Sequence, residues 1–313
     1  MLKKGKSILV IVAVISVIVL SFISVSFADK KPKVVVVLKA ADSQYWEIMK
    51  AGIEKGFKDF GIDGKVLVPK EASPKEQVEL LKQTYNEKPD IIITAPYNSS
   101  VGPILETFTD IPILLVDTNL TIKNKTAYIG TDNNDLGKKA GAFLASQLQP
   151  GDKVAIIGGD ISFSVFRERV DGASQSLKNA GMEIAYTKTG IPDDPKEVQK
   201  AISMVLRDHP DIKGVVTSHD TIALPVVKEL EKQGLLIPVI GPDGLTEMLK
   251  FIADETLPGT MAQNPYDMGY LSVETAMKVI KGENIEPFVD SGVDIIIKEN
   301  ALQRLNFYEK ILK

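Results

Sequence analysis

Charged, amide and aromatic side chains recur in this sequence directly after short apolar runs, where parallel β-strands are expected to end. Carboxylates accept hydrogen bonds from two hydroxyl groups, and an arginine donates in a fixed fork. A flat aromatic ring covers an apolar C–H face. This combination is typical of a site for a small polyhydroxylated ring such as a monosaccharide. The residues in question are Lys39, Ser43, Tyr45, Trp46, Asp117, Arg167, Arg169, His219, Asp220, Asp243 and Gln263.

The elements that must position these side chains alternate regularly between strand and helix. The strands are predicted at 34–38, 65–68, 91–94, 113–117, 154–157, 184–188, 214–218, 239–241, 260–262 and 294–297. The helices are predicted at 45–60, 74–87, 133–148, 167–180, 195–208, 222–233 and 266–281. Such alternation predicts an α/β protein with helices on both faces of parallel sheets. Ten strands favour two sheets, hence two doubly wound lobes with a cleft at the strand ends.

Composition excludes several classes of function. The chain of 313 residues has no cysteine and only two histidines, so neither a disulfide nor a zinc centre is expected. Its net charge of −4 argues against a nucleic-acid partner. No glycine-rich dinucleotide or phosphate-binding loop and no nucleophile–base pair occurs, so we expect a binding protein without a cofactor and not an enzyme.

The first 28 residues form a segment of their own. Three lysines precede an apolar run from Ile8 to Phe27, which ends in Ser26-Phe27-Ala28. A secretory signal peptide has this pattern, and an uncleaved membrane anchor of about 20 residues has a similar one. Both interpretations place the rest of the chain outside the cytoplasm, and either one confines membrane contact to residues 1–28 or to a partner.

Several candidate residues also have a purely structural interpretation. Asp132 and Asp220 could cap helices, as Ser73 and Asp194 are expected to do before Pro74 and Pro195. Arg167 could pair with surface acids. Trp46 could be a core residue between the lobes, and Asp243 could be a turn residue.

Together the motifs resemble the type I periplasmic binding proteins of the ribose- and allose-binding group over nearly the whole chain. The similar stretches are Asp42-Ser43-Gln44-Tyr45-Trp46, Thr131-Asp132-Asn133, Arg167-Glu168-Arg169 with Gly172, His209-Pro210-Asp211, Gly241-Pro242-Asp243-Gly244 and Ala262-Gln263-Asn264-Pro265. The resemblance implies a periplasmic-binding-protein-like fold of type I, in which the chain crosses three times between the lobes through a hinge. The implied lobes are residues 32–131 with 264–292, and residues 132–263 with 293–313.

The resemblance also implies which residues contact the sugar. By position these are Ser43, Tyr45, Trp46, Asp117, Arg169, His219, Asp243 and Gln263, with Lys39 matching a lysine of the allose-binding branch. Asp193 or Asp194 stands where relatives place an aromatic wall, and Asp193 is kept as a candidate. Phe163 or Phe166 is a substitute for that wall.

Other departures concern the identity of the sugar. His219 replaces the usual asparagine and is expected to contact a hydroxyl and to titrate near neutral pH. Thr118 replaces an arginine of ribose binders, and Pro242 replaces another aromatic residue. These changes leave ribose, xylose and other aldoses open.

The resemblance implies that hinge closure on the sugar is read by a membrane partner. The leading hypothesis is a solute-binding protein that delivers its sugar to an ABC transporter permease. The alternative is a membrane-tethered sensing subunit that reports the sugar to the ectodomain of a sensor histidine kinase in a two-component system. The fate of residues 1–28 would separate the two, because an uncleaved anchor favours sensing.

Overall fold

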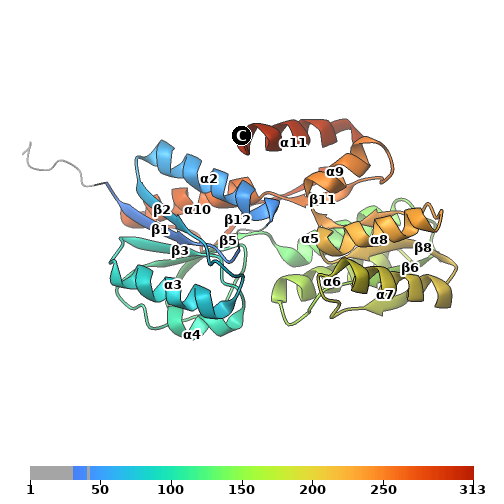
Figure 1. Ribbon diagram of the computed structural model, residues 1–313, viewed down its shortest axis with the longest axis horizontal. Coiled ribbons are helices and arrows are strands. Elements are labelled where there is room, and N and C mark those ends of the chain that lie inside the picture. Colours follow the sequence, from blue (N-terminus) through green and yellow to red (C-terminus); the bar gives the residue numbers. More distant parts are fainter. Residues whose placement is uncertain (1–30, 41–42) are drawn as a thin grey trace, which may run out of the picture.

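Two α/β lobes lie side by side along the long axis of the molecule (Figure 1). The computed structural model describes residues 31–40 and 43–313. The predicted signal or anchor segment 1–28 and Asp42 fall outside these ranges. No helix within the described ranges is both long enough and apolar enough to cross a membrane.

The first lobe is built on a fully parallel six-stranded sheet of order β12-β5-β4-β3-β1-β2. Its strands are β1 (Lys33–Val37), β2 (Asp63–Leu67), β3 (Ile91–Thr94), β4 (Ile113–Val116), β5 (Lys125–Gly130) and β12 (Phe288–Asp290). The central strands β1, β3 and β4 are almost wholly buried, as continuous apolar runs in a parallel sheet should be.

Helices cover both faces of this sheet. One core cluster joins Val34 and Val36 of β1 to residues of α2 (Gln44–Phe60) and α10 (Pro265–Ile280), and another joins Val35 and Val37 to α3 (Pro74–Asn86) and α4 (Gly102–Leu105). A short 3-10 helix, η1 (Ser99–Val101), precedes α4. Helices α2 and α10 can pack closely because Gly52 has no side chain: a Cβ atom there would collide with the backbone of Tyr266.

The second lobe has a parallel four-stranded sheet of order β7-β6-β8-β9 and a three-stranded sheet of order β10-β11-β13. Their strands are β6 (Lys153–Ile157), β7 (Glu183–Lys188), β8 (Ile212–Thr217), β9 (Val239–Ile240), β10 (Pro242–Asp243), β11 (Thr260–Gln263) and β13 (Val293–Ile296). The helices are α5 (Asn133–Ala145), α6 (Ser164–Asn179), α7 (Pro195–Asp208), α8 (Asp220–Lys232) and α9 (Thr246–Ala253). Strand β13 runs antiparallel to β11.

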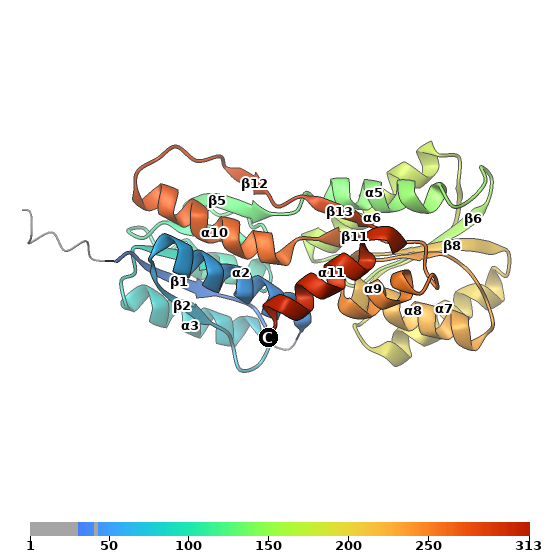
Figure 2. The same cartoon turned by 90° about the horizontal axis from the view of Figure 1, so that it is seen from above.

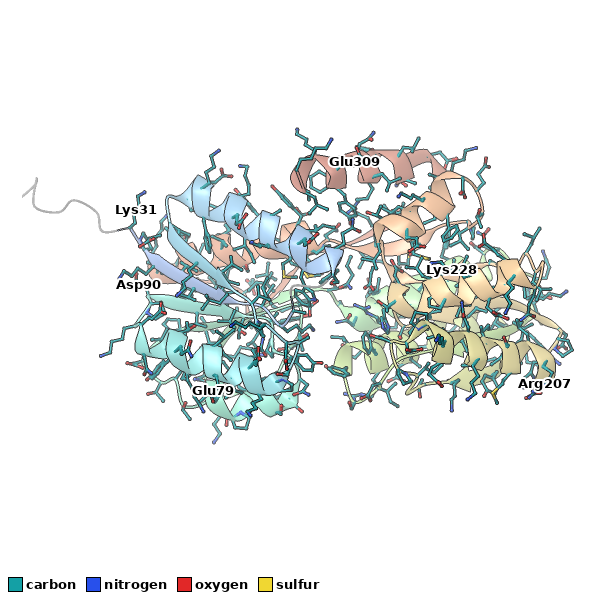
Figure 3. The ribbon with its side chains drawn as sticks, viewed as in Figure 1. Lys31, Glu79, Asp90, Arg207, Lys228 and Glu309 are labelled. Atoms are coloured by element: carbon teal, nitrogen blue, oxygen red, sulfur yellow. The ribbon has the colours of Figure 1, made fainter. Side chains whose placement is uncertain are left out.

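The carboxyl ends of the parallel strands in both lobes point toward the middle of the molecule, and only the antiparallel β13 points away from it among the described strands. Lys31 and Asp90, which lie beside the start of β1 and before β3, mark the outer end of the first lobe, and Arg207 at the end of α7 marks the outer end of the second (Figure 3). The chain passes between the lobes three times: from β5 to α5, from β11 to α10, and from β12 to β13. The lobe boundaries implied by the resemblance stay a prediction.

A C-terminal helix, α11 (Lys298–Ile311), lies across the seam between the lobes (Figure 2). It packs mainly on α9 and also touches α2. Tyr308 of α11 and Ile48 of α2 belong to one buried cluster with residues of α9. Helices η1, α4, α9 and α11 and strands β5, β10 and β12 were not predicted from the sequence.

The predicted helix starts can be compared with the observed caps. Ser73, Asp132 and Asp194 accept hydrogen bonds from backbone N–H groups of α3, α5 and α7, which confirms them as caps. The cap assigned to Asp220 is wrong: α8 begins one residue after His219, and Asp220 is its first residue. Its side chain instead accepts from the N–H of Leu245, at 2.7 Å.

Candidate functional site

A cavity of about 460 Å³ lies between the lobes at the carboxyl ends of their strands. All ten residues predicted for the site line it: Lys39, Ser43, Tyr45, Trp46, Asp117, Arg169, Asp193, His219, Asp243 and Gln263. They come from loops, helix starts and strand ends that are up to 224 positions apart in sequence, between Lys39 and Gln263. Their convergence follows from topology, because parallel strands place their carboxyl ends at one edge of a sheet.

The first lobe contributes a hydrogen-bonded group centred on Asp117. The Lys39 ammonium donates to Asp117 Oδ2 at 2.9 Å and to Thr118 Oγ1 at 2.8 Å. The Tyr45 hydroxyl donates to Asp117 Oδ1 at 2.8 Å. Burial alone would raise the pKa of Asp117, but Lys39 and these hydrogen bonds hold that pKa below its usual value. Asp117 is therefore an anion at neutral pH and can accept hydrogen bonds from the hydroxyl groups of a ligand.

The backbone of Asp117 is also unusual. Its φ of +63° lies in the left-handed region, which aspartate tolerates better than most residues. The Tyr128 hydroxyl donates to the Asp117 carbonyl at 3.0 Å and so supports this conformation. A strained backbone held by its surroundings is characteristic of functional positions.

Two aromatic rings form the wall of the first lobe. Tyr45 and Trp46 meet edge to face with centroids 5.1 Å apart, and the Lys39 ammonium lies 5.0 Å from the centre of the indole. Burial, followed by the charges of Asp117 and Asp243, raises the pKa of Tyr45 well above its usual value. Tyr45 therefore stays a neutral phenol that donates to the Asp117 carboxylate.

Arg169 is the main cation of the second lobe, and its side chain is only 5% exposed. Its Nε donates to Asn133 Oδ1 at 2.9 Å, and its Nη1 donates to the Ser218 carbonyl at 3.0 Å and to Asp243 Oδ1 at 3.1 Å. Among the described residues, Nη2 donates to no protein acceptor. This geometry leaves one arm of the fork for a ligand oxygen.

Gln263 connects the two halves of the cavity. Its Nε2 donates to Asp243 Oδ1 at 2.6 Å, its Oε1 accepts from Thr131 Oγ1 at 3.0 Å, and the Tyr45 hydroxyl oxygen lies 3.4 Å from Oε1. Thr131 and Gln263 both lie where the chain crosses between the lobes. A change in the site is therefore linked directly to the crossing segments.

His219 lines the cavity, but both of its ring nitrogens are engaged within the protein. Nδ1 lies 2.8 Å from Ser218 Oγ, and Nε2 lies 2.9 Å from Asp193 Oδ1. Phe166 stacks on the ring with centroids 4.2 Å apart. In this arrangement the histidine holds Asp193, and its expected contact with a sugar hydroxyl stays a prediction.

Sequence reasoning missed several lining residues. Tyr97 follows β3 and Asp160 follows β6, so both obey the strand-end rule that identified the other candidates. Phe163 and Phe166 both line the cavity, as considered above, and Tyr97 meets Phe163 across the cleft with centroids 6.4 Å apart. Val165, Ile191, Thr221 and Leu245 gave no distinct signal in the sequence.

A fully buried carboxyl, Asp220, lies directly behind the site. Its N–H donates to Asp243 Oδ2 at 3.1 Å, and its own Oδ1 has no hydrogen-bond partner among the described residues. Burial, followed by the negative charge of Asp243, raises the pKa of Asp220 well above its usual range. At a pH between the pKa of Asp220 in the unfolded chain and its raised pKa in the folded protein, the folded protein therefore retains a proton that the unfolded chain has lost.

We expect Asp220→Asn to stabilise the fold at neutral pH. The unfolded aspartate loses its proton near pH 4, whereas the folded one keeps it to higher pH, so the wild type loses stability as pH rises between these two values. The amide does not titrate, and its advantage should exceed about 1 kcal/mol at neutral pH. Denaturant unfolding over a pH series measures this, and an advantage that does not vanish below pH 4 would contradict the assignment.

A second cavity, of about 470 Å³, lies between the start of α10, β13 and α11. Asn264, Asp267, Asp294 and Arg304 are among its lining residues. None of the ten predicted site residues lines it. Its Arg304 already donates a hydrogen bond to Asn264 at 3.0 Å and forms an ion pair with Asp294. We therefore assign the candidate site to the cavity between the strand ends. No metal-binding cluster occurs among the residues that the structure describes.

Comparison with known proteins gives consistent matches. A family model described as "Periplasmic binding protein domain" matches residues 34–284. The ribose import binding protein of Salmonella typhimurium is 26% identical over 288 residues, which cover 91% of this chain and 97% of that protein. The D-allose-binding periplasmic protein of Escherichia coli is 27% identical over 267 residues, which cover 80% of this chain and 86% of that protein.

Solved structures give the same result. A glucose-galactose binding protein from Geobacillus stearothermophilus superposes with a TM-score of 0.80 at 26% identity and covers 87% of this chain and 99% of its own. A solute-binding protein of an ABC transporter from Burkholderia graminis, in complex with D-arabinose, has a TM-score of 0.78 at 25% identity and covers 87% and 96%. These relatives are named as binding proteins, in agreement with the expectation that the chain is not an enzyme.

Proposed function

The chain belongs to the family of periplasmic binding protein domains, and from this premise we propose that it binds one monosaccharide between its lobes. One observation carries the proposal: ten strand-end residues from both lobes meet in a single cavity. Asp117, Asp243 and Gln263 provide acceptors, Arg169 provides a donor, and Trp46 provides a flat wall. This set matches a ring with one apolar face and a rim of hydroxyls.

The dimensions and energetics of the site agree with this ligand class. A pentose or hexose has about eleven heavy atoms, and the best small ligands gain up to about −1.5 kcal/mol per atom. Micromolar or tighter binding is therefore attainable. We favour an aldose, with pentoses such as ribose or xylose first.

We further propose that binding closes the lobes about the three crossing segments. Lys39, Trp46 and Asp117 belong to the first lobe, and Arg169 and Asp243 belong to the second. A sugar contacts both sets only when the lobes are together, so it shifts the population toward the closed form. The closed protein would then present its sugar, outside the cytoplasm, to the permease of an ABC transporter.

A thermal-shift panel tests the proposal. Ribose, xylose, allose, arabinose, glucose and galactose would each be added to the purified chain, with maltose as a larger control. A sugar present at 100 times its Kd should stabilise the fold by roughly 2.7 kcal/mol. If no monosaccharide raises the melting temperature above the buffer control, the proposed function is wrong.

A further inference from the structure

The charges that line the cavity do not balance. Lys39 neutralises Asp117 at 2.9 Å, and Arg169 neutralises Asp243 at 3.1 Å. The lining residues also include Asp160 and Asp193, and within the described part of the chain neither carboxylate lies within 4 Å of a lysine or an arginine. The cavity therefore carries an excess of negative charge on its second-lobe side.

Asp193 is fixed in position and yet open to the cavity. Its side chain is 53% exposed, whereas that of His219, which holds it, is 6% exposed. Ser218 Oγ accepts from the Gly159 N–H at 3.0 Å, so its own proton is free to be donated to His219 Nδ1. His219 Nε2 lies 2.9 Å from Asp193 Oδ1. The histidine thus holds the carboxylate in place at the edge of the cavity.

The surroundings of Asp193 favour a cation over an anion. Phe166 covers the face of His219, and the same cavity is lined by Tyr97, Phe163 and Trp46. Aromatic faces attract ammonium groups, and a hydrogen bond between two charged groups is about twice as strong as a neutral one. A negatively charged ligand would meet repulsion from Asp193, and the positive charges of Lys39 and Arg169 are already balanced by Asp117 and Asp243.

We propose that the cavity selects monosaccharides by charge, with Asp193 as the selecting residue: it binds an amine-bearing sugar more tightly than the neutral parent and rejects the acidic form. This inference rests on the proposed function, because it concerns which sugar the same cavity accepts. The ligand class it adds is a hexose or pentose that carries a protonated amine. Asp193 forms the ion pair with that amine, and His219 is the positioning residue that holds Asp193.

Matched sugars test the proposal by titration calorimetry near neutral pH. The probes are glucose, galactose and mannose, each compared with its 2-amino form and its uronic acid. At least one amino sugar should bind about tenfold more tightly than its parent, which is the difference between a charged and a neutral hydrogen bond. Each uronic acid should bind at least tenfold more weakly than its parent.

Two variants identify the responsible carboxylate. Asp193→Asn is nearly isosteric and lies on an exposed loop, and it should abolish the preference for the amine. Asp171→Asn makes the same change of charge at an exposed position of α6 outside the cavity and should keep the preference. A preference that survives in Asp193→Asn would overturn the assignment.

The outcomes separate this inference from the proposed function. If neutral sugars bind but no amino sugar binds more tightly than its parent, or if a uronic acid binds as well as its parent, charge selection is wrong and monosaccharide binding stands. If no sugar in either panel binds, both are wrong.

Discussion

Arg169→Ala is expected to abolish sugar binding and to lower the free energy of unfolding by about 3–5 kcal/mol. The substitution removes the donors to Asn133, to the Ser218 carbonyl and to Asp243. Asp243 then keeps its charge in a nearly buried position without its cation. Removing one partner of a buried ion pair costs far more than the pair contributes, because the remaining charge is left desolvated. Denaturant unfolding and calorimetry with the best sugar of the panel measure the two losses.

A neighbouring arginine provides the matched control. Arg167 lies two residues earlier and is exposed, and within the described ranges it donates only to the Ile161 carbonyl, at 3.0 Å. Arg167→Ala should therefore change both quantities little. Arg169→Lys should retain part of the stability, because it keeps a charge near Asp243, but it loses the planar fork. Full stability together with full affinity in Arg169→Ala would show that the site has been assigned to the wrong residue.

Trp46→Ala is the second change with a large expected effect. Trp46 is 8% exposed and packs in the core of the first lobe with Met49 and Ile53 while also lining the cavity. Truncation of a buried tryptophan to alanine costs roughly 3–5 kcal/mol of stability. It also removes the wall for the apolar face of the sugar and the ring beneath Lys39, so affinity should fall by more than tenfold.

Trp46→Phe separates the two roles. A smaller aromatic ring should restore most of the stability but only part of the affinity, because it covers less of the sugar. The chain has one tryptophan, so fluorescence of the wild type reports on this site alone, and a change on sugar addition is expected. Unchanged sugar affinity in Trp46→Ala would leave Trp46 with the purely structural role considered for it.

The site could be predicted from the sequence because one topological rule applies to every strand of a parallel sheet. Continuous apolar runs such as those of β1 and β4 identified the strands, and Tyr45 and Asp117 then followed from their positions after them. The rule was not applied after β3, so Tyr97 was missed, and after β6 it identified Arg169 but not Asp160.

Other features depend on contacts that no local pattern encodes. The role of His219 is determined by Ser218 beside it and by Asp193, 26 positions earlier. Helix α11 buries only Ala301 and Tyr308, so its sequence lacks a broad apolar stripe, and it is stabilised by packing on α9. Strand β5 begins with half-buried polar positions and is completed by pairing with β4 and β12.

The interleaved path of the chain has a consequence for the order in which the molecule can assemble. The sheet of the first lobe gains its edge strand only at Phe288–Asp290, and the second lobe gains β13 and α11 only at Val293–Ile311. A chain that emerges N-terminus first, whether from a ribosome or from a membrane channel, completes neither lobe until the segment that carries β12, β13 and α11 is free. Pairing across such long sequence separations is slow. The nascent chain thus stays incompletely folded throughout its emergence, and the two lobes are completed almost together.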